Sequence, residues 1–209
     1  MSKSFFRLSS AIGVATLLVL AACSKKEAAT PASEPPAAST ATAEAAPAVA
    51  APITKDASVI DLMRNTIAPT ADALWGAVGS ESTATGTRDL APSTDAEWAA
   101  LRQKAQTLVD SAKAIAEAGR MVAHPGQKLK DPPGPGDLSP EQAQAQITKD
   151  RAVYVGFATA MQGVGNDYLA AIDKKNVEAI TDVGGKLDEV CEACHTRFWY
   201  PNAPKPPGQ

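Results

Sequence analysis

Aromatic residues, cysteine, histidine and methionine are all scarce in this chain of 209 residues. Aromatics make up 5% of it, and it holds 3 cysteines, 2 histidines and 4 methionines. Alternating runs of β-branched residues, which are typical of strands, are also missing, so the Ala-rich composition predicts a helical fold. The net charge of −3 gives no basic surface for nucleic acid. Because cysteine, histidine and methionine are the usual ligands of metals and haem and are scarce here, a cluster of them indicates a functional site.

The longest apolar run lies close to the N-terminus, from Ala11 to Leu20, and is too short for a permanent membrane-spanning helix. Lys3 and Arg7 precede it and small residues follow, which is the layout of a secretory signal peptide, so we expect residues 1–22 to be such a leader. The segment Leu20 to Cys23, Leu-Ala-Ala-Cys, resembles the lipobox of bacterial lipoproteins, in which the cysteine is lipid-modified and becomes the new N-terminus. The alternative is ordinary cleavage beside an incidental cysteine.

The lipobox resemblance implies a mature protein that is anchored by acyl chains on Cys23 rather than spanning the membrane. Ser24 stands where aspartate would favour retention at the inner membrane, so the resemblance favours the periplasmic side of the outer membrane. Residues 24–52 are almost entirely Ala, Pro, Ser, Thr and Glu, which cannot form a core. We therefore expect a lipidated Cys23 with a disordered tether to residue 52, followed by one globular domain over residues 53–209.

Amphipathic patterns in this domain predict four helices, at residues 55–78 with a kink at Pro69, 94–122, 139–172, and from 176 into Cys191. Capping-box residues mark the start of the second and third helices. None of the connections, the longest being residues 80–93 and 125–138, requires a crossover along the molecule, so neighbouring helices should be antiparallel. The prediction is an all-α fold, an antiparallel up-down-up-down four-helix bundle.

Residues 191–195, Cys-Glu-Ala-Cys-His, bring together two of the 3 cysteines and one of the 2 histidines. The spacing C-x-x-C-H is typical of covalent haem attachment, in which Cys191 and Cys194 form thioethers with the haem and His195 coordinates the iron. On a helix, positions i, i+3 and i+4 share a face, so all three side chains address one flat ligand. The haem would then lie at the end of the fourth helix.

Other chemistries use the same residue types. A zinc site would need a fourth ligand, for which the other strong donors are Cys23 and His124. A thioredoxin-like dithiol needs a βαβ context, whereas this sequence is helical around the motif. A disulfide between Cys191 and Cys194 would be cramped within a helical turn. A haem-free structural or zinc-binding lipoprotein remains an alternative from a different functional class.

The second face of the haem needs a ligand from upstream of the motif, because residues 196–209 contain no usual haem ligand. In an unbroken third helix Met161 would lie roughly 30 Å from the haem end at 1.5 Å per residue. That leaves Met63, Met121 and His124, or an open coordination position. Met63 is the preferred candidate, because it falls on the inward face of the first helix.

A helical domain with a C-terminal C-x-x-C-H and the segment Leu-Met-Arg at residues 62–64 resembles the class II cytochromes c, namely cytochrome c′ and its low-spin, methionine-ligated relatives. The resemblance covers about residues 55–200. It implies one covalent haem c on the two motif cysteines, His195 as the proximal iron ligand and Met63 as the distal ligand. Relatives of this class are often dimers.

A methionine-histidine haem has no vacant coordination site and a raised reduction potential, which suits an electron carrier rather than an enzyme. We therefore expect a lipid-anchored periplasmic monohaem cytochrome that passes single electrons between redox partner proteins. The alternative is a five-coordinate protein that binds nitric oxide or another small gas, with Met63 only lining the pocket. Arg64 and Arg197 lie close enough in sequence to the ligands to pair with haem propionates, and residues 198–200 either shield a haem edge or close the end of the bundle.

Overall fold

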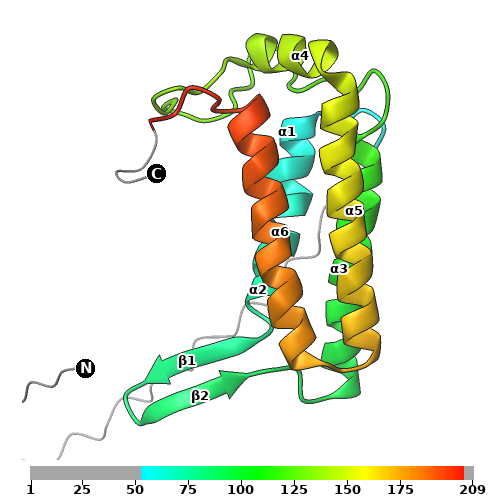
Figure 1. Ribbon diagram of the computed structural model, residues 1–209, viewed down its shortest axis with the longest axis vertical. Coiled ribbons are helices and arrows are strands. Elements are labelled where there is room, and N and C mark those ends of the chain that lie inside the picture. Colours follow the sequence, from blue (N-terminus) through cyan, green and yellow to red (C-terminus); the bar gives the residue numbers. More distant parts are fainter. Residues whose placement is uncertain (1–52, 205–209) are drawn as a thin grey trace, which may run out of the picture. The chain divides into compact units, whose positions relative to one another are not determined.

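The computed structural model describes residues 53–204, and the expectations for residues 1–52, including lipidation of Cys23, lie outside the described residues. Over residues 53–204 the protein is mostly helical, with one two-stranded sheet (Figure 1). Its elements are α1 (Val59–Leu62), η1 (Met63–Ile67), α2 (Ala68–Trp75), β1 (Gly79–Thr83), β2 (Gly86–Leu90), α3 (Asp95–Ile115), α4 (Pro140–Lys149), α5 (Arg151–Asp173) and α6 (Val177–Phe198).

The first helix is one continuous segment made of α1, the π-helix η1 and α2. Ser58 caps its start, since its hydroxyl accepts the Asp61 N–H at 3.2 Å while the Asp61 carboxylate accepts the Ser58 N–H at 2.9 Å. In η1 the Ala68 N–H donates to the carbonyl of Met63, five residues back. Pro69 has no N–H to continue the α-helical ladder, so the helix changes its hydrogen-bond register just before it. We expected a kink at Pro69, and the structure has a π-helix directly before this proline, over Met63–Ile67.

A β-hairpin follows, where the sequence predicted only a connection over residues 80–93. β1 and β2 pair antiparallel from Gly79 opposite Leu90 to Thr83 opposite Gly86. All of its residues except the half-buried Leu90 are exposed, and the hairpin projects from the helices (Figure 1). The expectation of a purely helical domain was therefore wrong in this segment. The hairpin has no apolar alternation because neither of its faces packs on the core, so the usual strand signal is missing.

The second predicted helix ends earlier than expected, because α3 stops at Ile115 rather than Val122. Gly119 adopts a left-handed conformation (φ 79°), which turns the chain out of the helix. The carbonyls of residues 121–122 then accept the N–H groups of residues 59–60 at 2.9 and 3.0 Å. This segment therefore supplies partners to the first turn of α1, whose N–H groups have no acceptor within the helix.

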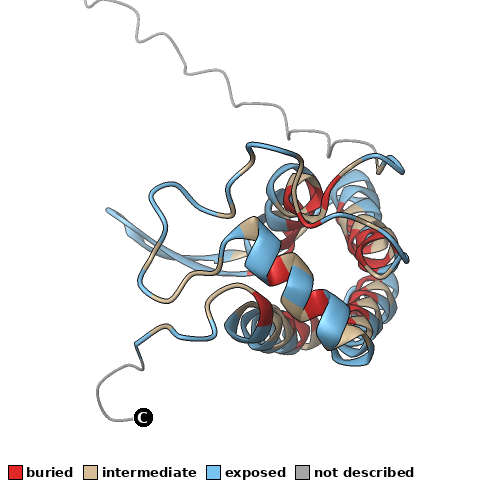
Figure 2. Ribbon diagram, turned by 90° about the horizontal axis from the view of Figure 1, so that it is seen from above, coloured by how far each residue is buried: buried red, intermediate tan, exposed pale blue. Residues whose placement is uncertain are grey.

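The third predicted helix is two helices, α4 and α5, which meet at Asp150 (φ −111°, ψ 39°). The Asp150 carboxylate forms an ion pair with Arg197 of α6, which holds the break in place. α4 lies across the ends of the long helices (Figures 1 and 2), and its Ile147 packs in a small cluster with Phe198. The prediction of an unbroken helix over residues 139–172 was wrong for this reason.

Four long helical segments, α1–η1–α2, α3, α5 and α6, pack side by side around the main core (Figures 1 and 2). α3 lies against α5 and α2, and α6 lies against α5 and α2. α3 and α5 approach closely at Gly165, where an added Cβ would come within 2.6 Å of Val109 Cγ2. The start of α1 and the end of α6 lie at the same end of these segments, the end that α4 covers (Figure 1). No helix among the described residues combines the length and apolarity needed to cross a bilayer.

Candidate cofactor site

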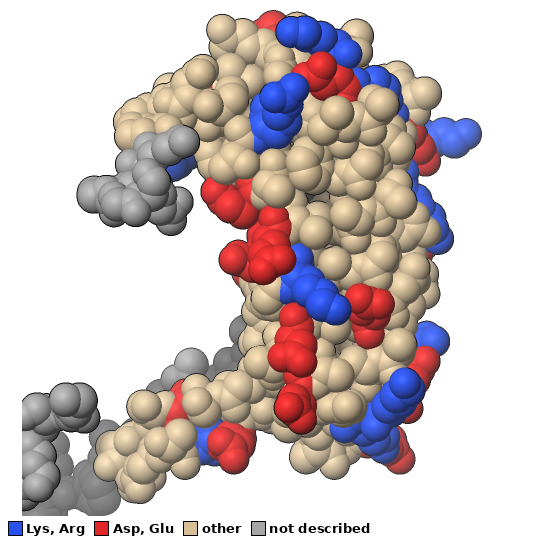
Figure 3. Space-filling model, viewed as in Figure 1, with Lys and Arg blue, Asp and Glu red and all other residues tan. Residues whose placement is uncertain are grey.

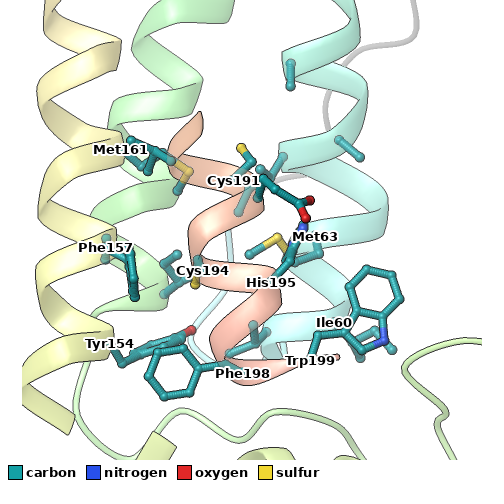
Figure 4. A pocket seen from close by; sticks show the side chains of 18 of the residues that line it. Ile60, Met63, Tyr154, Phe157, Met161, Cys191, Cys194, His195, Phe198 and Trp199 are labelled. Carbon is teal, nitrogen blue, oxygen red and sulfur yellow. The ribbon is translucent and has the colours of Figure 1, made fainter. Parts of the chain in front are cut away.

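A cavity of about 460 Å³ lies between the first helix, α5 and α6 (Figure 4), and α4 contributes to its wall. Its volume and its mostly apolar wall are typical of cofactor sites. The apolar part of the lining comes from every helical element, and it includes Ile60, Ile67, Ala71, Ile115, Ile147, Phe157, Ala158 and Val190.

Cys191, Cys194 and His195 all line this cavity. They lie on successive turns near the end of α6, and each side chain is half-buried. The helical setting that the sequence predicted for the motif is confirmed, and the two thiols are free rather than joined in a disulfide. Two sulfurs and one imidazole are therefore presented to one apolar space from one helix face.

Burial controls the protonation of these three groups. It raises the pKa of Cys191 to about 11, with a further contribution from Asp188, and it raises the pKa of Cys194 to about 12, with a contribution from Cys191. Burial also lowers the pKa of His195, partly opposed by Glu192. At neutral pH the thiols stay protonated and the imidazole stays neutral. A neutral imidazole is the form that binds metal, whereas a redox dithiol depends on a lowered thiol pKa.

Met63 reaches the same cavity from the opposite side, from the first residue of η1. Figure 4 shows its thioether beside the imidazole of His195. π turns inside helices are frequent at functional sites, and this one begins at the methionine that the sequence analysis preferred as distal ligand. The structure thus brings Met63 together with the motif that lies more than a hundred residues later in the chain.

The other two candidate ligands do not reach the cavity. Met121 is 49% exposed and is not part of the cavity wall. His124 lies with its Nε2 3.3 Å from Asp61 Oδ2. Burial acts to raise the pKa of Asp61, but hydrogen bonds from Ser58 and Gln127 outweigh it and hold that pKa below its usual range. His124 therefore sits beside a charged carboxylate at the surface, in a structural contact.

Met161, which the sequence argument placed far from the motif, lines the cavity together with Cys191. The argument failed because it counted residues along an unbroken third helix. α5 begins at Arg151, so Met161 is only about ten residues, or roughly 15 Å, from the start of its helix. Figure 4 shows Met161 and Met63 on different walls, with the cysteines between them.

The aromatic residues after the motif close one end of the cavity. Phe198 is buried and lines it. Trp199 stands edge-on to His195, with 5.2 Å between ring centroids. Tyr200 turns outward, where its hydroxyl donates to Glu192 at 2.6 Å. Phe198 packs with residues of α4 at the end of α6, whereas the shielding of a haem edge by this segment stays a prediction.

The two arginines suggested as propionate partners bind protein groups. Arg64 donates to the carbonyls of Lys128 and Leu129 at 2.6 and 3.1 Å, which fixes the loop over residues 125–138 against η1. Arg197 forms the ion pair with Asp150. Arg64 still forms part of the cavity wall, whereas Arg197 does not.

Two further wall residues were not identified as site residues by the sequence analysis. Tyr154, at the start of α5, lines the cavity. Trp75 also lines it, is 37% exposed, and donates from its Nε1 to the Gly184 carbonyl at 3.0 Å. The first turns of α5 reach the site because the helix breaks at Asp150, and the sequence analysis did not predict that break.

The rim of the cavity is acidic. Asp72, Asp188 and Glu192 contribute to its wall and are all exposed. Figure 3 shows acidic side chains gathered along the side of the molecule on which α6 lies. Within residues 53–204, no group of three or more His, Cys, Asp and Glu side chains is arranged to hold a metal ion. Comparisons with protein-family models, with curated proteins and with solved structures found no match.

Proposed function

We propose that this chain is a lipid-anchored periplasmic cytochrome of the c type, with one covalent haem, which carries single electrons between partner proteins. One observation carries the proposal: Cys191, Cys194, His195 and Met63 all line a single apolar cavity. The scarce residues of the chain converge there from two helical segments that are distant in sequence.

The residues present fit a haem. Two thiols and a neutral imidazole on one helix face match its two vinyl groups and its iron. Two buried donors on the cavity wall, Tyr154 Oη and Trp199 Nε1, have no hydrogen-bond partner in the described part of the chain, as expected of a wall shaped for a bound group. Cys191 and Cys194 would hold the haem covalently.

When bound, the haem would supply an iron that alternates between the ferric and ferrous states. His195 and Met63 would both hold the iron. The apolar wall would exclude water, and α4 would close the end of the cavity. The thioether of Met63 would favour the ferrous state, and with both residues holding the iron the protein would rearrange little between the two redox states.

The finer architecture belongs to this proposal. We infer that α1–η1–α2, α3, α5 and α6 form the antiparallel four-helix bundle of the class II cytochromes c, with α4 and the hairpin as additions. The pairwise packing of the four segments supports this interpretation, as does the position of the start of α1 and the end of α6 at the same end. In such a bundle the haem would lie at the end of the last helix.

The anchor and the partners follow from the sequence and the surface charge. A lipid on Cys23 would confine the domain near membrane redox proteins and raise their effective concentration. The acidic rim formed by Asp72, Asp188 and Glu192 favours a partner with a basic docking surface.

Optical spectra of the full chain, produced with a haem-attachment system, test the proposal. Met63→Leu and Met161→Leu form a matched pair, because both remove a thioether from the cavity wall at nearly constant volume. We expect covalent haem in all three proteins, low-spin spectra for the wild type and Met161→Leu, and a high-spin spectrum for Met63→Leu. A wild type that is already high-spin, and unchanged by Met63→Leu, would favour the gas-binding alternative. A colourless protein that binds zinc stoichiometrically would favour the haem-free alternative.

A further inference from the structure

The Tyr154 hydroxyl is a buried donor that the protein itself leaves unused. Tyr154 is 3% exposed, and its Oη has no hydrogen-bond partner among the described residues. A buried polar group without a partner is destabilising, so such groups are few in folded proteins and each needs an explanation. The position of this one, on the wall of the cofactor cavity, suggests that the bound group supplies the acceptor.

Packing fixes the direction of the Tyr154 ring. Phe198 meets it edge-on, with 5.4 Å between centroids and 88° between planes. The Arg151 guanidinium lies over the ring, 5.6 Å from its centroid. Ile147 of α4 belongs to the same buried cluster. The contacts with Phe198 and Arg151 therefore restrict the rotation of the ring, whose hydroxyl points into the cavity (Figure 4).

Cys194 lines the same cavity as this hydroxyl and interacts with it electrostatically. Figure 4 shows the Tyr154 oxygen directed toward the Cys194 side chain. Burial raises the pKa of Tyr154, and the Cys194 sulfur raises it further, so the hydroxyl stays protonated and remains a donor. A free thiol can donate as well as accept, whereas a thioether sulfur has no hydrogen and can only accept.

We propose that Tyr154 is a positioning residue for the covalent haem, and that its hydroxyl donates to the Cys194 sulfur once that sulfur is a thioether. The role of Tyr154 rests on the proposed function, and through it Tyr154 would help to set the reduction potential of the haem. The hydrogen bond fixes the haem edge at Cys194 and draws electron density from the thioether sulfur. Because the positive end of the O–H dipole faces the haem, the hydrogen bond favours the reduced, more electron-rich state and raises the reduction potential.

Tyr168 provides a matched control on the same helix. It is fully buried, and its hydroxyl also lacks a partner. That hydroxyl, however, lies against Gly184, where an added Cβ would be 3.3 Å from it. Gly184 precedes Cys191 by seven residues, or roughly 10 Å along α6. Tyr168→Phe therefore removes the same chemical group from the same helix, but away from the Cys194 sulfur.

The test compares haem-loaded wild type, Tyr154→Phe and Tyr168→Phe by redox titration and by resonance Raman spectroscopy of the thioether C–S stretch. We expect Tyr154→Phe to lower the reduction potential and shift the C–S band, and Tyr168→Phe, whose hydroxyl interacts with Cys191 rather than with Cys194, to change both by less. A Tyr154→Phe protein with the wild-type potential and C–S band would overturn the inference, as would equal shifts in both variants.

Haem staining on a denaturing gel separates this result from a failure of the proposed function. A wild type without covalent haem would overturn both the function and the role of Tyr154. A haem-bearing wild type whose potential does not respond to Tyr154→Phe would overturn the role of Tyr154 alone.

Discussion

The imidazole of His195 and the indole of Trp199 meet edge to face, with 5.2 Å between their centroids and 88° between their planes. The backbone joins them as well, since the Trp199 N–H donates to the His195 carbonyl at 2.8 Å. The last turn of α6 therefore orients the imidazole that would bind the iron. This arrangement depends on helical spacing of four residues, which places both side chains on one face.

Replacing Trp199 should loosen that imidazole. An aromatic edge contact contributes about 0.5–1.5 kcal/mol beyond its buried area, so Trp199→Leu should lower the free energy of unfolding of the haem-loaded protein by at least this amount. Trp199→Phe keeps an aromatic edge and should lose less. Chemical unfolding followed through the haem absorption measures the difference. Equal stability of the two variants would contradict the role of the contact.

The start of α6 was predictable from the local sequence, whereas the break between α4 and α5 was not. We predicted a helix from residue 176 because of its regular apolar face, and in the structure Asn176 caps that helix through its own side chain. The break between α4 and α5 depends instead on the Asp150 pair with Arg197, 47 residues away. Hydrophobic periodicity continues across that break and hides it.

The residues of the candidate site were likewise predictable only in part. Cys191, Cys194 and His195 were found from their spacing alone, and Met63 from its place on an apolar helix face. The wall contributed by α5 was not found, because its position depends on where α4 ends. Because the start of α5 was predicted at the start of α4, the predicted position of Met161 was wrong by the length of α4. The prediction placed Met161 far from the cavity, whereas it lines the cavity wall.

The approach of α3 and α5 can be tested at Gly165. A Cβ there would lie 2.6 Å from Val109 Cγ2, and a valine side chain has little freedom to move away. Gly165→Ala should therefore destabilise the protein by about 1–3 kcal/mol. Gly163→Ala on the same helix is the control: nothing lies within 4 Å of its added Cβ, so it should stabilise by about 0.5–1 kcal/mol. Urea unfolding would measure the change in unfolding free energy of each variant, and the two changes should have opposite signs. A Gly165→Ala protein that is more stable than the wild type would refute the close packing.

The start of α3 should respond to acid through Glu97. The backbone N–H groups of Ser93 and Thr94 and the Ser93 hydroxyl donate to its carboxylate, which lowers its pKa to about 2 from the usual 4.5. Because the folded-state pKa is the lower one, the stabilisation is complete above pH 4.5, declines as the pH falls, and is gone below about pH 2.

Glu97→Gln gives the measurement for this helix start. The difference in unfolding free energy between the wild type and Glu97→Gln should be constant above pH 4.5 and shrink between about pH 4.5 and 2. Effects of other titrating groups are common to both proteins and cancel in the difference. A difference that stays constant down to pH 2 would show that the Glu97 carboxylate does not cap α3 in its charged form.

Asp150 and Arg197 hold α4 over the cavity, and Asp150→Asn should loosen that cover. Partly exposed ion pairs contribute about 0.2–1 kcal/mol, so global stability should change little. Local opening should change more, because the pair fixes the break from which α4 turns across the helical ends, and amide hydrogen exchange within α4 should accelerate several-fold. Asp173→Asn removes the exposed pair with Arg102 at the opposite end of α5 and serves as the control. If exchange in α4 is equally slow in both variants, the cover is held by the packing of Ile147 rather than by the ion pair.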